Sequence, residues 1–469
     1  MATGTQTATD QPQTVPIAAA TDGPPEHHGL ASKWPIAMDL AGSSQPCRLE
    51  GEFADLPVLG TIPDAIDGTF YRVMCDPFVP PHPQNVPIDG DGSISAFRLR
   101  GGRVDARIRY IETERYRLER RAGRALFGLY RNPYTHHPCV RAAVDSTANT
   151  NLVYWAGQLL ALKEVALPYA VDPDTLATRG WVVLVLWPFE ADVERMKQGG
   201  QHWAWSYERP ATFVVVPRRK GGRLPEGWKD GEYRTYHWEN AMLIHTGAAW
   251  ESDDGARLWF ESSRVMDNAF PFFPPADGRM PAPDAQADFV RWELDLTAPS
   301  GTRVADPRVV LDMPAEFPRI DERFLTRQCD ALFACVFLPN RSDGGKNIFH
   351  GLNALAMHSH SSGQTRFFYA GDDSLVQEPV FIPRAADAPE GDGWVMAMVE
   401  RRGANRNDLV VLDTREFEKP VAIVQLPLHV KAQIHGNWVD ASELGEWKSL
   451  VTQLPDVEIS GKGALEPMI

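Results

Sequence analysis

The sequence consists mainly of short apolar or alternating segments separated by turn residues, and this pattern restricts the chain to a mainly β architecture. Residues 97–104 contain two alternating stretches with a Gly-Gly turn between them. Residues 152–162, 289–311 and 394–412 repeat the order strand, polar turn, strand. Many short strands with frequent turns are typical of sandwiches, barrels and propellers. We therefore expect an all-β fold.

Helical patterns are few. Residues 191–197 predict a short helix that ends at Gly199 and Gly200, and residues 441–450 carry apolar side chains at helical spacing. Residues 271–287 are rich in Pro, Ala and Asp and indicate a surface loop between strands. The sequence has no WD or kelch repeat, so repetition alone does not predict a propeller.

Charge and cysteine content exclude several classes of protein. The formal net charge of -15 argues against a nucleic-acid partner, because phosphate binding requires clustered Lys and Arg. The five cysteines form no Cys-x-x-Cys pair, which favours reduced thiols in the cytosol over a disulfide framework or a zinc site. No apolar run approaches the length of a membrane span. We therefore expect a cytoplasmic protein without a transmembrane segment.

The N-terminus lacks the features of a signal peptide. It has no basic start and no apolar core, and it is rich in Thr, Ala, Gln and Pro. Residues 1–35 are therefore predicted to be a disordered leader.

Two histidines stand in contexts that suit a metal ligand. His237 and His435 each follow or end a predicted strand and have apolar or small neighbours. A buried ligand needs a neutral imidazole held in one orientation. A single histidine on a strand is nevertheless more often a structural or surface residue.

Three glutamates lie beside apolar residues in a similar way. They are Glu164, Glu316 and Glu378. A buried carboxylate must be paired or hydrogen-bonded. The partner is either the N–H of a metal-bound imidazole or an arginine, and the residues alone leave both open.

Taken together, seven short segments of the sequence resemble the carotenoid cleavage oxygenase family. The segments occur in the family's order and span most of the chain, from about residue 56 to residue 438. They are residues 68–72, 89–92, 163–164, 236–237, 316–319, 378–381 and 435–438.

The resemblance implies a seven-bladed β-propeller with Fe(2+) on its axis, held by four histidines. Three glutamates in a second layer would orient three of the imidazoles. His237 and His435 resemble the third and fourth ligands. Glu164, Glu316 and Glu378 resemble the three glutamates. Iron held by imidazoles with open positions suits the activation of O2.

Within the family, the stilbene-cleaving enzymes look most similar. Tyr130 and Lys163 occur where those enzymes grip the para-hydroxyl of a phenolic stilbene. The resemblance implies cleavage of the central C=C bond with O2 to give two aromatic aldehydes. Cleavage of an apocarotenoid is an alternative, in which the small-molecule substrate is a polyene. A non-catalytic, iron-free propeller is another.

The match fails at one place, near residues 180/181. Residues 176–180 resemble the upstream side of the region that carries the first two histidine ligands, and residues 182–188 resemble its downstream side. No histidine occurs between Tyr154 and Arg195. The expected loss is at least one blade, on the order of 40–50 residues. We thus expect one oxygenase domain over residues 36–440 with an internal deletion, and an atypical tail over residues 441–469.

Three explanations of the deletion remain. The preferred explanation is that a segment of coding sequence was removed from the gene prediction as if it were an intron. The second is that the chain is a truncated relative that binds no iron. The least favoured is replacement of the lost ligands by other histidines. The candidates are His136, His137, His202 and His245.

Overall fold

The computed structural model describes most of the chain between residues 45 and 444. The described residues are 45–82, 84–143, 145–155, 158–163, 181–217, 224–229, 231–270, 272–275, 277–279, 282, 285–338, 351–371, 373–444 and 450. The predicted leader, Glu164 and most of the predicted tail lie outside this set. Of the helix expected over residues 441–450, the first four residues form a turn and most of the rest is not described.

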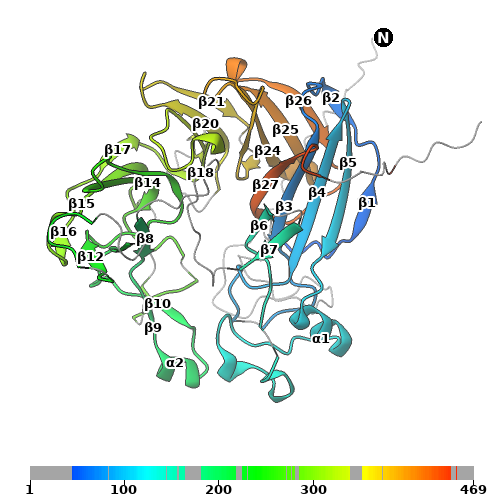
Figure 1. Cartoon of the computed structure of the whole chain (residues 1–469). Coiled ribbons are helices and arrows are strands. Elements are labelled where there is room, and N and C mark those ends of the chain that lie inside the picture. The colour runs from blue at the N-terminus through cyan, green and yellow to red at the C-terminus, as the bar shows by residue number, and fades with distance from the viewer. Residues whose placement is uncertain are drawn as a thin grey trace, which may run out of the picture.

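Five sheets of four or more strands lie around a common centre, so the all-β prediction is confirmed and the sheets are the blades of a propeller (Figure 1). The first blade, in spatial order, contains β1 (Gly51–Phe53), β5 (Arg103–Tyr110), β4 (Gly92–Arg100), β3 (Gly68–Cys75) and β27 (Gln433–Asp440). The second contains β2 (Val58–Gly60), β26 (Pro420–Gln425), β25 (Arg406–Asp413), β24 (Gly393–Arg401) and, along one edge, β22 (Ser374–Val376) and β23 (Val380–Pro383).

The other three blades follow the simple order of the chain more closely. The third contains β18 (Ala315–Ile320), β19 (Ala331–Val336), β20 (Ala354–Ser359) and β21 (Thr365–Tyr369). The fourth contains β13 (Thr246–Glu251), β14 (Arg257–Val265), β15 (Ala287–Asp295) and β17 (Arg308–Leu311). The fifth contains β8 (Trp181–Leu186), β11 (Thr212–Pro217), β12 (Arg234–His237) and β16 (Thr302–Arg303).

The first blade joins the two ends of the described chain. β27, from the C-terminal part, pairs antiparallel with β3, from the N-terminal part, and places Trp438 opposite Phe70. Apolar side chains from this blade and the second form one continuous core that includes Phe70, Phe97 and Met396, all fully buried. This burial between sheets is the main source of stability in such a layered fold.

The ring of blades is open at one place in the described part of the chain. β6 (Asn151–Trp155) and β7 (Gln158–Leu162) form a two-stranded sheet beside β27. The next strand that the structure describes is β8, which pairs with β11. The described residues therefore make five blades and two two-stranded sheets where the family resemblance implies seven blades.

Two helices lie on one side of the sheets, together with the short hairpin of β9 (Phe189–Ala191) and β10 (Trp203–Trp205) (Figure 1). The predicted short helix is confirmed as α2 (Val193–Lys197). α1 (Glu114–Ala122) was not predicted. Its buried side chains include Arg115 and Glu119, so it packs through an ion-pair network and lacks the apolar periodicity by which helices are recognised.

Remaining short 3-10 turns connect the strands. They cover Pro133–Thr135, Pro138–Val140, Glu322–Phe324, Arg402–Ala404 and Thr414–Glu416. The loop expected over residues 271–287 does connect two strands, β14 and β15, but it is not wholly at the surface, since Phe273 is fully buried. None of the described helices is long and apolar enough to cross a membrane.

Candidate active site

His435 lies on β27, the innermost strand of its blade, and its orientation is fixed by Glu378. The His435 Nδ1 lies 2.9 Å from Oε1 of Glu378, and the other oxygen of that carboxylate accepts the N–H of Gly436 at 2.8 Å. A carboxylate that accepts from Nδ1 fixes the tautomer and leaves Nε2 free to bind a metal. The predicted relation between an orienting glutamate and an imidazole is therefore present at these two residues.

His245 and Glu316 repeat this arrangement from the neighbouring blades. His245 directly precedes β13, and Glu316 lies on β18. The His245 Nδ1 lies 2.5 Å from Oε2 of Glu316. Burial disfavours the imidazolium, but the adjacent Glu316 carboxylate outweighs that effect and raises the pKa of His245. The second histidine with an orienting glutamate is therefore His245.

The two imidazoles face each other. The ring centroids of His245 and His435 are 5.0 Å apart, and the ring planes meet at 81°. The ring of Phe317 lies 4.7 Å from that of His245 and 5.8 Å from that of His435. Phe317 has a φ of 52°, a value that bulky residues rarely adopt, and such strain is concentrated at functional sites.

His237 is not part of this pair, which corrects the expectation that it stands on the axis. It ends β12, the third strand of its blade counted from β8, and its backbone lies between Thr212 and Arg303. β11 separates that strand from the edge of the blade at which β8 lies, whereas the resemblance implies ligands on the innermost strands. The sequence suggests His245 only as one of four possible substitutes for the lost ligands.

The other three substitutes have different surroundings. His136 lies 3.7 Å from Asp145, His137 contacts Cys139, and His202 contacts Met196. Among the four candidates, the structure thus brings His245 alone next to His435.

Glu378 sits in a strongly cationic environment. Arg72, which is fully buried, and Arg319 each approach its carboxylate to 3.4 Å. Burial alone would raise the pKa of Glu378, but Arg319, His435 and Arg72 together hold it at about 2. The carboxylate is therefore ionised at neutral pH and acts as a permanent acceptor for the His435 N–H.

Lys163 and Tyr130, the predicted phenol grip, are brought together. The Lys163 Nζ lies 5.8 Å from the centroid of the Tyr130 ring, although the two residues come from different loops. Lys163 directly follows β7, and the β6–β7 pair is linked to the strand of His435, because the Asn437 side chain donates to the Leu152 carbonyl. Glu164, the remaining predicted glutamate, lies outside the described residues.

Aromatic side chains surround Tyr130 on its other sides. Trp203 and Phe273 have ring centroids 6.1 Å and 6.2 Å from that of Tyr130, and Phe189 stacks on Trp203. Flat rings of this kind favour a flat aromatic ligand through stacking and edge contacts.

The residues present do not by themselves fit an iron site of four histidines. His245 and His435 have the orientation of metal ligands, each with a carboxylate behind Nδ1. In the described ranges, however, no group of three or more His, Cys, Asp or Glu residues is arranged to hold a metal ion. Two imidazoles are half of the expected set.

Comparison with known proteins gives a consistent result. The sequence matches the family described as retinal pigment epithelial membrane protein over residues 44–182 and 177–440. The chain is 58% identical to resveratrol cleavage oxygenase 1 of Botryotinia fuckeliana, over 97% of this chain and 96% of that protein. It is 34% identical to resveratrol cleavage oxygenase 1 of Aspergillus fumigatus, over 89% and 98% respectively.

A solved structure agrees with these matches. The crystal structure of lignostilbene dioxygenase from Pseudomonas brassicacearum superposes with a TM-score of 0.77 at 31% sequence identity. The superposition covers 87% of this chain and 99% of that chain. The likeness therefore extends over nearly the whole fold.

The matches also have a discontinuity. The family match consists of two pieces that meet at residues 177–182. The alignment with the Botryotinia protein has 535 positions, whereas 97% of 469 residues is about 455, so about 80 positions have no residue of this chain. The break lies between β7 and β8, where the ring of blades is open.

Proposed function

Because the chain belongs to the retinal pigment epithelial membrane protein family, which includes the carotenoid and stilbene oxygenases, we propose that it derives from an iron(II)-dependent dioxygenase of hydroxylated stilbenes. O2 would cleave the central C=C bond and give two aromatic aldehydes. The observation that carries the proposal is the proximity of the Lys163 ammonium to the Tyr130 ring.

The grip has a direct chemical use. The ammonium of Lys163 and the hydroxyl of Tyr130 can both hydrogen-bond to a substrate phenol. An ammonium beside a phenol favours its phenolate form, and this increases electron density in the conjugated double bond. A polyene has no hydroxyl at that position, so these residues favour a stilbene over an apocarotenoid.

In this proposal, His245 and His435 supply two of the iron ligands, with Glu316 and Glu378 as their orienting partners. His245 thereby takes the role expected of His237. Iron would supply O2 activation once its other ligands are present. The chain itself supplies the orientation of the two imidazoles and the binding of the phenol.

The other two ligands would come from a segment absent between residues 180 and 181. The two-piece family match and the unmatched positions of the alignment support such a segment. The unmatched positions limit its size to about 80 residues, which is close to two blades of about 40–45 residues each. An iron-competent form would therefore carry this insertion, and the 469-residue chain would be an iron-free propeller.

We also propose a cytosolic location. All five cysteines are free thiols, and three of them, Cys75, Cys329 and Cys335, are buried, which suits a reducing compartment.

Two versions of the protein test the proposed function. One is the 469-residue chain, and the other has the corresponding segment of the Botryotinia protein inserted after Gly180. With ferrous iron and O2, the inserted version is expected to convert resveratrol to two aldehydes, and the 469-residue chain is expected to give none. An inserted version that binds iron but cleaves only an apocarotenal would overturn the assignment of substrate.

A further inference from the structure

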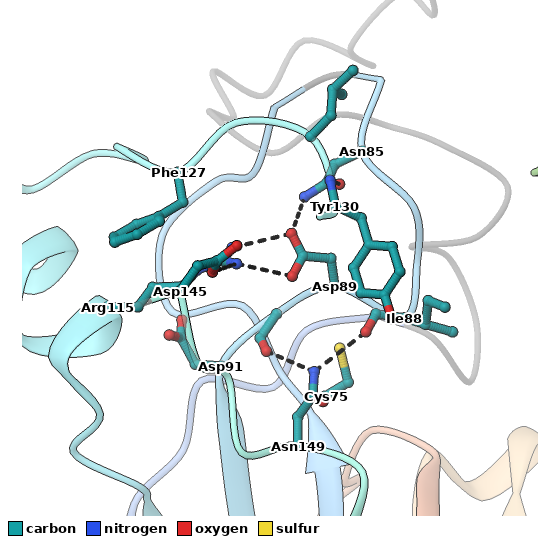
Figure 2. A network of polar contacts seen from close by, with 12 residues as sticks. Cys75, Asn85, Ile88, Asp89, Asp91, Arg115, Phe127, Tyr130, Asp145 and Asn149 are labelled. Atoms are coloured by element: carbon teal, nitrogen blue, oxygen red, sulfur yellow. Dashed lines mark hydrogen bonds and ion pairs between the residues drawn. The ribbon is translucent and has the colours of Figure 1, made fainter. Parts of the chain in front are cut away.

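One buried guanidinium connects the loops around the phenol grip. Arg115, on α1, donates to Oδ1 and Oδ2 of Asp89 at 2.9 Å and 3.1 Å, and to Asp145 at 3.0 Å (Figure 2). Its Nε lies 3.6 Å from Glu119, one turn along the same helix. The Arg115 and Asp89 side chains are 6% and 1% exposed, so this network is shielded from solvent.

The first branch of the network leads to Tyr130. Asp89 accepts a hydrogen bond from the Asn85 amide at 2.6 Å, and the Asn85 carbonyl oxygen accepts the backbone N–H of Tyr130 at 3.0 Å (Figure 2). Asn149 donates to the Ile88 and Gly90 carbonyls and thereby fixes the turn that carries Asp89. The backbone of Tyr130 is thus held through three side chains.

The second branch leads to Lys163. Asp145 accepts from Arg115 through its carboxylate, while its backbone carbonyl accepts from the Lys163 Nζ at 3.4 Å. The ring of Phe127 lies under the Arg115 guanidinium at 5.4 Å. Both residues of the grip are therefore connected to a single arginine through hydrogen bonds.

We propose that Arg115 is a positioning residue for stilbenes that carry a free para-hydroxyl, because it sets the separation of Lys163 from Tyr130. The inference rests on the proposed function. Arg115 does not itself contact the substrate in this scheme. It orders Asp89 and Asp145, and through them it keeps the ammonium and the tyrosine at the distance that suits a phenol.

The geometry suits arginine rather than lysine. The planar guanidinium binds both oxygens of Asp89 and still reaches Asp145, which a single ammonium cannot do in the same plane. Burial alone would raise the pKa of Asp89, but the Arg115 charge, with hydrogen bonds from Arg115 and Asn85, lowers it. Both partners are thus ionised and the network is fixed at neutral pH.

The test measures preference for the hydroxyl group and needs no iron. Dissociation constants of the 469-residue chain for 4-hydroxystilbene and for unsubstituted trans-stilbene are obtained from quenching of tryptophan fluorescence. Trp203, 6.1 Å from Tyr130, is a suitable reporter. Wild type is expected to bind the hydroxylated probe about tenfold more tightly, since one hydrogen bond to a charged group supplies at least that factor.

Three variants and a matched control make the result specific. Arg115→Lys and Asn85→Ala are expected to reduce the preference to about threefold or less, and Lys163→Met is expected to abolish it. The control is Asp288→Asn, which removes a carboxylate from a similarly buried bidentate pair with Arg264 in another blade. It is expected to lower stability without changing the preference.

The outcomes separate the two proposals. If wild type shows no preference for the hydroxyl, the phenol grip itself fails. If Lys163→Met loses the preference while Asn85→Ala and a folded Arg115→Lys retain it, the role of Arg115 is overturned and the proposed function stands. Should Arg115→Lys not fold, Asn85→Ala decides, because Asn85 is only half-buried and its replacement leaves the Arg115 ion pairs intact.

Discussion

His245 and His435 come from different blades, yet their imidazoles lie 5.0 Å apart at an angle of 81°, and each has a glutamate at its Nδ1. In this arrangement each glutamate orients its imidazole through Nδ1, and Nε2 of each ring is not used in that contact. A carboxylate behind Nδ1 is the arrangement expected of an imidazole that binds a metal.

The first prediction distinguishes His245 from His237. In the version of the protein with the inserted segment, His245→Ala and His435→Ala should each abolish retention of iron, because each removes one of the proposed ligands. His237→Ala is the control and should retain iron like the parent, since His237 lies on β12, away from the pair. The measurement is iron content after gel filtration. Loss of iron in His237→Ala alone would reverse the assignment.

The second prediction concerns turnover. Lys163→Met in the inserted version should lower kcat/KM for 4-hydroxystilbene by about tenfold or more, which is what loss of a hydrogen bond to a charged group costs. Lys197→Met provides the control, because Lys197 is an exposed lysine paired with Glu194 on α2. Equal kcat/KM values for Lys163→Met and the control would exclude a contact between Lys163 and the phenol.

The third prediction follows from the pKa of Asp91. Burial raises this pKa from 3.8 to about 6. A carboxyl whose pKa is higher in the folded state stabilises the fold below pH 3.8, and that contribution is lost as the pH rises through 6. Relative to Asp91→Asn, wild type should therefore lose about 3 kcal/mol of unfolding free energy across this window. Urea unfolding at pH 4 and pH 7.5 measures the difference, and a difference that does not change with pH would contradict it.

The fourth prediction concerns the contact between β27 and β3. A Cβ at Gly436 would lie 2.4 Å from the Tyr71 carbonyl and from the Arg72 side chain, so Gly436→Ala must push the two strands apart. We expect a loss of about 1–3 kcal/mol, the usual cost of overpacking. In Gly247→Ala the closest atom is 3.2 Å away and belongs to the Phe289 side chain, so the loss should be smaller. Thermal unfolding of both variants would show the order, and equal melting temperatures would be incompatible with it.

Strand pairs were predictable because their signals are local. The turn near Gly101 appears in the structure as the sequence indicates, and β6 and β7 pair antiparallel as expected. α1 was not predictable from apolar periodicity, since two of its three buried side chains, Arg115 and Glu119, are charged. Its Thr113 cap and Gly123 terminus were the available signals.

The error at His237 has a topological cause. Both His237 and His245 follow apolar residues and stand near strand ends, so their local contexts are similar. What distinguishes them is the position of their strands in a blade: β12 is an outer strand, and β13 is an innermost one. To assign that position from the sequence, one must know which strands belong to each blade. Here the β9–β10 hairpin lies between two strands of one blade, and β16, from later in the chain, pairs with β12.

The order of motifs in the sequence was enough to identify the orienting glutamates but not their histidine partners. Glu316 and Glu378 were assigned through motifs that occur in the family's order, and each lies against a histidine. Which histidine belongs to which glutamate could not be read from spacing, because Glu316 reaches back to a residue of the preceding blade.

The most direct test of the account is the iron content of the 469-residue chain, purified in parallel with the version that carries the inserted segment. Both would be loaded with ferrous iron without oxygen and then passed through a desalting column. We predict about one iron per chain for the inserted version and none above background for the 469-residue chain. Retention of about one iron by the 469-residue chain would contradict the account, because other ligands would then complete the site of His245 and His435.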